Sequence, residues 1–90
     1  MKITTAEFLQ RTNLDRTTLE IWIEEEWIIP QSAADPRFSD VDLARAQLIR
    51  ELIDDLGVNA EGVGIVLRLV DQVHGLRSVL AETVAALRAR

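Results

Sequence analysis

The stretch T-T-L-E-I-W-I-E-E-E-W-I-I-P, residues 17–30, decides the fold. It begins with the spacing of an amphipathic helix, because Leu19 and Trp22 recur three residues apart. It ends with three bulky residues at 27–29, which favour a strand, and a proline stops that strand. The stretch therefore predicts a helix over about residues 16–25, followed at once by a short strand.

A first helix is predicted just upstream. Thr5 is a candidate N-cap, and Phe8 and Leu9 supply the buried face of that helix, which ends at residues 12–13. Asp15 is then a candidate N-cap for the second helix. Two short helices joined by a tight turn form the helix-turn-helix plan.

A small wing is predicted after the second helix. Residues 31–37 contain turn chemistry at Asp35-Pro36, and Phe38 then returns the chain as a second strand. We expect this strand to form a hairpin with residues 27–29. Residues 2–3 are predicted to be a short strand or an extended lead-in.

A third helix follows the wing. Ser39 and Asp42 have the spacing of a capping box, so we expect a helix over about residues 40–56. Gly57 then provides its C-cap. Asn59 is a candidate cap for a last helix, and Gly75 leaves open whether that helix is continuous.

The last segment shows a heptad pattern. A helix of about 30 residues is about 45 Å long, more than a small head can cover. We therefore expect its last turns to pack on a second chain, as in a homodimer, or to fold back as a hairpin. The predicted oligomer interface consists of Val66, Leu69, Val73, Leu76, Leu80 and Leu87.

The 90 residues suit a single domain. Its predicted fold is mainly α, with a winged helix-turn-helix head over residues 1–58, a small β-hairpin wing, and a long C-terminal helix over residues 59–90.

The charge distribution argues against nucleic acid as the ligand. The chain has 10 Lys and Arg against 15 Asp and Glu, a net charge of −5. Residues 1–59 carry −6, whereas residues 60–90 carry +1. A head that binds a duplex usually has a basic face, because the duplex is densely negative. We therefore expect no direct contact with nucleic acid.

Other functional classes lack their signatures. The chain has no cysteine, and it contains no phosphate-binding loop, nucleophile motif or metal-ligand spacing around its single histidine, His74. We expect no enzyme activity, no cofactor and no metal. The N-terminus lacks the apolar region of a secretory signal, and no apolar run is long enough to span a membrane. A cytoplasmic protein without membrane contact is expected.

The opening stretch also matches a known framework. The matching residues are Thr18, Leu19, Trp22, Trp27, Ile28 and Pro30. In this framework the chain, over residues 17–69, resembles the MerR-like winged helix-turn-helix family, whose pattern is T-[LI]-R-Y-Y-E-x-x-G-L-[LI]-x-P. Where that family places Arg and Tyr toward DNA, this chain has Glu20 and Ile21, which repel phosphate or offer it no hydrogen bond. Glu26 stands where the family has a turn glycine.

A narrower resemblance lies further along the chain. The segments D-L-G-V-N at 55–59, E-G-V at 61–63 and D-Q-V-H-G-L at 71–76 are similar to the CbpM-type chaperone modulators. These are small relatives of the MerR fold that pair with a J-domain co-chaperone, curved-DNA-binding protein A. The resemblance implies that the chain binds the J-domain and inhibits the co-chaperone and DNA-binding activities of that partner.

The acidic second helix suits such a partner. A J-domain presents a basic helix to its Hsp70, and an acidic, partly apolar helix would bind it through electrostatic complementarity. The candidate partner-binding residues are Glu20, Ile21, Ile23, Glu24 and Glu25. Two alternatives remain open: a dimeric DNA-binding regulator of the MerR type, and a module that serves only oligomerisation.

Overall fold

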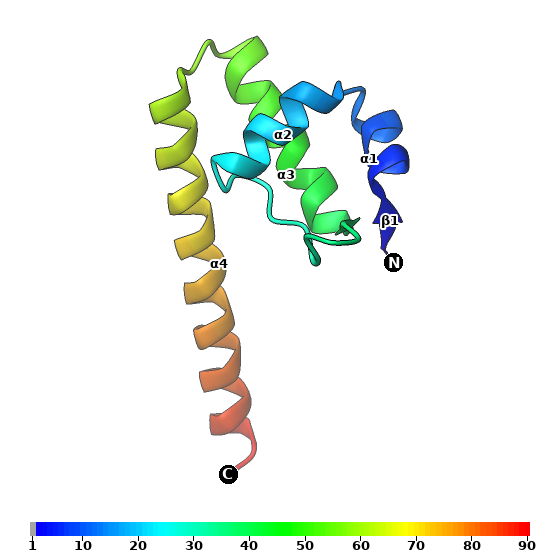
Figure 1. The fold of residues 1–90 in the computed structure, drawn as a ribbon. Coiled ribbons are helices and arrows are strands. Elements are labelled where there is room, and N and C mark those ends of the chain that lie inside the picture. Colours follow the sequence, from blue (N-terminus) through cyan, green and yellow to red (C-terminus); the bar gives the residue numbers. More distant parts are fainter. Residues whose placement is uncertain (1) are drawn as a thin grey trace. The chain divides into compact units, whose positions relative to one another are not determined.

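The computed structural model describes residues 2–90 (Figure 1). Its elements, in chain order, are β1 (Ile3–Thr4), α1 (Thr5–Thr12), α2 (Arg16–Glu24), β2 (Arg37–Phe38), α3 (Asp40–Arg50), the π-helical segment η1 (Glu51–Asp55) and α4 (Ala60–Arg88). The chain divides between Val58 and Asn59 into two compact units, the head and the α4 unit. The predicted fold class, mainly α with a helix-turn-helix head and a long C-terminal helix, is confirmed. The small two-stranded sheet is present, but it pairs β1 with β2 and is not the predicted β-hairpin wing.

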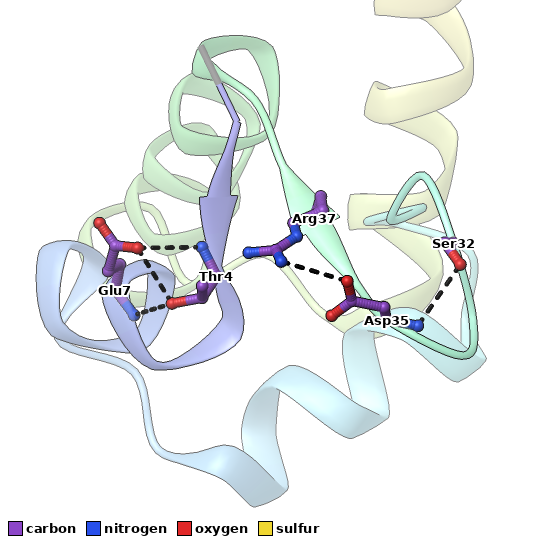
Figure 2. Close-up of polar contacts among 5 residues, drawn as sticks. All are labelled: Thr4, Glu7, Ser32, Asp35 and Arg37. Atoms are coloured by element: carbon purple, nitrogen blue, oxygen red, sulfur yellow. Dashed lines mark hydrogen bonds and ion pairs between the residues drawn. The ribbon is translucent and has the colours of Figure 1, made fainter.

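Helix α1 begins one residue earlier than predicted. Thr4 is the N-cap instead of Thr5, because the Glu7 N–H donates to the Thr4 hydroxyl at 3.2 Å. The Glu7 carboxylate in turn accepts from the Thr4 N–H at 3.3 Å, which completes a capping box (Figure 2). Asn13 ends the helix in the left-handed conformation, with φ 58°. The predicted end at residues 12–13 is confirmed.

Helix α2 begins at the predicted cap. The Asp15 carboxylate accepts a hydrogen bond from the Thr18 N–H at 2.7 Å. Hydrogen bonds from the Thr18 hydroxyl and from the Thr18 N–H lower the pKa of the Asp15 carboxyl below its ordinary value of 3.8. The charged form of Asp15 is therefore the form that stabilises α2.

This cap makes the head sensitive to acid in a defined direction. The stabilisation is fully present above the unfolded value of 3.8 and is lost as the pH falls through the lower folded pKa. Asp15→Asn keeps a capping oxygen but cannot titrate. We therefore expect the melting temperature of the native chain to fall toward that of Asp15→Asn between about pH 5 and about pH 2. A gap between the two that stays constant over this range would contradict the assignment.

The predicted strand over residues 27–29 is wrong. Phe38 pairs instead with the N-terminal strand, in an antiparallel register that sets Ile3 opposite Phe38. Residues 27 and 28 are drawn back toward α2, because the Trp27 and Ile28 N–H groups both donate to the Trp22 carbonyl, at 2.9 and 3.3 Å. Their side chains favour a strand, but their backbone is held in a turn. Of the two alternatives predicted for residues 2–3, the short strand is observed as β1, one residue later than predicted.

Two stacked aromatic rings lie at the centre of the head. Phe8 of α1 and Phe38 of β2 are fully buried, with ring centroids 4.3 Å apart and planes 22° from parallel. The other side chains of the head with 2% exposure or less are Leu19, Ile28, Ala46 and Ile49. Around this core, α1 and α3 pack on each other and on the small sheet.

Helix α3 starts as predicted but changes its pitch before it ends. The Asp42 carboxylate accepts from the Ser39 N–H at 2.9 Å, in the expected capping box. From Glu51 the expected α-helix continues as the π-helical segment η1. Gly57 then turns the chain with φ 68°, the left-handed conformation expected of a C-cap glycine.

Helix α4 is one continuous helix of 29 residues. Asn59 caps it by accepting from the Gly62 N–H at 2.8 Å, as predicted. The helix passes through Gly75 without interruption, so the expectation of a fold-back hairpin does not hold. Val63 and Leu67 are buried, whereas every residue from Asp71 onward is exposed. In the described part of the chain, no helix is both long and apolar enough to cross a membrane.

Candidate functional site

Four of the five predicted partner-binding residues share the exposed side of α2. Burial of Leu19 and Trp22 fixes which side of the helix faces the core. Glu20, Ile21, Glu24 and Glu25 are all exposed. We call these four residues the acidic face. Ile23, the fifth candidate, is only half-buried and lies on the edge of α2 nearest to Leu19.

The acidic face combines charge with one apolar side chain. Ile21 is 50% exposed, and its neighbours three and four positions along the helix are Glu24 and Glu25. Within residues 2–90, none of the three glutamates of the face forms an ion pair. An apolar anchor surrounded by unpaired carboxylates suits the binding of a basic, partly apolar surface.

A strained residue closes the acidic face at its C-terminal end. Glu26 adopts the left-handed conformation, with φ 62°, and its N–H donates to the Ile23 carbonyl at 3.0 Å. The turn brings the Trp27 ring to 6.4 Å from that of Trp22, while Glu26 itself stays exposed. The sequence pointed to this position because Glu26 stands where a turn glycine was expected. The structure shows that Glu26 adopts the left-handed conformation that a glycine would adopt more easily.

Relieving this strain is expected to stabilise the head. A non-glycine residue in the left-handed region costs about 1 kcal/mol or more, so Glu26→Gly should raise the free energy of unfolding by about 1 kcal/mol. Asn13→Gly is the matched control: Asn13 has nearly the same φ, but asparagine tolerates it, and the gain should be only a few tenths of a kcal/mol. Urea titration of both variants measures the difference. A loss of stability in Glu26→Gly would show that its side chain contributes more than the strain costs.

Three of the six cations of the head, Arg37, Arg45 and Arg50, interact with other groups of the head. In the segment of residues 31–38, the Arg37 guanidinium lies 3.1 Å from the Asp35 carboxylate, and the Asp35 N–H donates to Ser32 at 3.4 Å (Figure 2). Arg45 donates to the Trp27 carbonyl, and Arg50 to the carbonyl of residue 12. Arg37 is the only cation of residues 31–38, so a ligand phosphate would have to compete with Asp35 for it. Residues 31–38 therefore offer little positive charge to the phosphates of a duplex.

The predicted oligomer interface is an exposed stripe on α4. Leu69, Val73, Leu76, Leu80 and Leu87 are between 46% and 70% exposed, while Val66 is half-buried. We call these six residues the apolar stripe. Rows of exposed apolar side chains of this length are typical of surfaces that bind other proteins.

A second surface on α4 was missed at the level of sequence. A shallow hollow, the α4 groove, runs along its last turns and is lined by Arg77, Leu80, Ala81, Val84, Ala85, Arg88 and Ala89. Its sequence signal was available: two alanines one turn apart, between two arginines that fall on the same side of the helix. This signal was missed because only the heptad positions of α4, which lie on a neighbouring side of the helix, were considered.

The placement of side chains that could bind a metal ion is a further feature of the described residues. Among residues 2–90, no three His, Asp or Glu side chains are placed to hold a metal ion. His74 is exposed on α4.

Comparison with known protein families gives a match over most of the chain. Residues 3–84 match the family described as MerR HTH family regulatory protein. No curated protein matches the chain. The family match covers both units, so it includes the acidic face and most of α4.

Proposed function

The chain belongs to the MerR helix-turn-helix family of regulatory proteins, and from this premise we propose that it regulates by binding a protein. The proposed partner is the J-domain of a DnaJ-like co-chaperone of the curved-DNA-binding protein A type. Binding would inhibit the co-chaperone and DNA-binding activities of that partner, as in the CbpM-type modulators that the chain resembles.

The observation that carries this proposal is the chemistry of α2. In a reading helix that binds DNA, the exposed side carries cations and hydrogen-bond donors for phosphates and bases. Here the same side carries Glu20, Glu24 and Glu25 around the half-exposed Ile21. Three carboxylates next to a duplex are repulsive, whereas next to a basic helix they are attractive.

The basic helix of a J-domain is the surface that contacts Hsp70. A modulator bound there blocks that contact by occupying it, with no conformational change required. Because the attraction is between exposed charges, it mainly accelerates association and weakens as salt screens it. Ile21 supplies the part of the affinity that salt does not screen.

We further propose that α4 joins two copies through the apolar stripe. Its exposed leucines and valines are too extensive for a solvated surface, and a second copy covers them with the same residues. Such a homodimer carries two acidic faces and so binds two J-domains.

Calorimetric titration with a purified J-domain tests the proposed function. We expect binding that weakens as the salt concentration rises, and little binding of a J-domain whose basic helix has been charge-reversed. A duplex DNA titrated in parallel should give no salt-dependent binding. If the duplex binds, with affinity falling steeply in salt, and the J-domain does not, the chain is a DNA-binding regulator of the MerR type.

A further inference from the structure

The α4 groove shares Leu80 with the apolar stripe but differs from it in chemistry. Ala81 and Ala85, one helical turn apart, line it between Arg77 and Arg88. All four are exposed. At 100° per residue, Glu82 projects from the other side of the helix. The groove is therefore apolar along its centre and positive at both ends.

A surface with this pattern fits an acidic helix that carries one apolar side chain. Small residues one turn apart let another helix approach closely, and a branched side chain fills the space above them. Carboxylates on either side of that side chain would then face the two arginines. Arginine suits such pairs, because its planar guanidinium binds carboxylates in two-pronged geometry.

The acidic face of α2 has these features. Ile21 is the apolar side chain, and Glu20, Glu24 and Glu25 surround it without ion pairs. We propose that the α4 groove of one copy of the chain binds the acidic face of a second copy. Ile21 lies over Ala81 and Ala85 in this arrangement, and the glutamates meet Arg77 and Arg88.

The helix dimensions agree with this pairing. Arg77 and Arg88 are eleven residues apart, or about 16 Å along α4, whereas Glu20 and Glu25 are about 8 Å apart along α2. The long side chains of arginine and glutamate close the remaining distance at each end, with Ile21 between them. The two units in contact have opposite charges, +1 on residues 60–90 and −6 on residues 1–59, so the attraction is local and must exceed the long-range repulsion between two chains of −5 each.

This contact goes beyond the proposed function and does not require a J-domain. It occupies the surface that we propose for the J-domain, so self-association and partner binding compete. The apparent affinity for the partner therefore falls as the concentration of the chain rises.

Disulfide cross-linking tests the inference directly, because the chain has no cysteine of its own. Full-length Ile21→Cys and Ala81→Cys chains, one with a mass tag, are mixed and oxidised mildly. We expect the mixed dimer to form at least about tenfold faster than with Ala86→Cys as the α4 variant, since docking raises the effective concentration of the thiols. Ala86 is also an exposed alanine, but it lies on another side of α4. Equal rates for the two α4 variants would overturn the inference.

Charge exchange provides the second arm. Glu20→Lys with Glu24→Lys in the Ile21→Cys chain, or Arg77→Glu with Arg88→Glu in the Ala81→Cys chain, should each reduce the rate to that of the Ala86→Cys control. Mixing the two charge-reversed chains should restore it. If the rate of cross-linking does not change with these substitutions, the proposed pairing is wrong. Since no J-domain is present, either outcome leaves the J-domain titration to decide the proposed function.

Discussion

Replacing Phe8 with alanine is expected to lower the free energy of unfolding of the head by about 3–5 kcal/mol. Phe8 is fully buried, and its ring stacks on that of Phe38 with centroids 4.3 Å apart. The substitution removes the apolar transfer free energy of the ring and leaves a cavity between α1 and β2. Because whole domains are stable by only about 5–15 kcal/mol, much of the stability of the head would be lost.

Urea unfolding followed by circular dichroism measures this loss. Val41→Ala is the control, because Val41 also lies on a helix of the head but is 71% exposed, and its truncation should change the stability by less than about 0.5 kcal/mol. Similar effects for the two substitutions would mean that the aromatic stack is not the centre of the core.

Reversing the charge of Glu20, Glu24 and Glu25 to lysine is expected to weaken J-domain binding by about 30-fold to 1,000-fold. An exposed ion pair is worth about 0.2–1 kcal/mol, and reversal replaces each attraction with a comparable repulsion. Three reversals therefore cost about 1–6 kcal/mol, and the middle of this span, about 2–4 kcal/mol, corresponds to the stated range of affinity. All three side chains are exposed, so the fold should remain intact.

A second triple variant separates local from overall charge. Glu51→Lys, Asp55→Lys and Glu82→Lys together change the net charge by the same amount, at exposed positions outside the acidic face. This variant should lose only a small part of the affinity, through the long-range field. Calorimetry at one salt concentration compares the two. Equal losses would show that net charge, and not the acidic face, drives binding.

The helix-turn-helix could be predicted because its signals are local. The Asp15 cap and the spacing of Leu19 and Trp22 act within one or two turns of a helix, and the structure retains them. The predicted strand at residues 27–29 was wrong because the backbone N–H groups of this segment bond to a carbonyl of α2 and not to a neighbouring strand. The Trp22 carbonyl takes the N–H groups of residues 27 and 28, and side-chain propensity does not encode that competition.

The exposed side of α2 could also be predicted, since burial of two residues fixes the opposite side of a helix. The half-burial of Ile23 could not, because it depends on how closely α2 packs on the core. The π-helical segment after Arg50 was not predicted, because its residues show the same apolar spacing as the α-helix before it.

Arg50 determines how the head opens locally. From the end of α3, its guanidinium donates to the carbonyls of Thr12 and Asn13, where α1 ends. The last turn of α1 cannot separate from α3 unless both hydrogen bonds break. In native-state hydrogen exchange, we therefore expect these two segments, 37 or 38 residues apart in sequence, to lose protection as one cooperative unit.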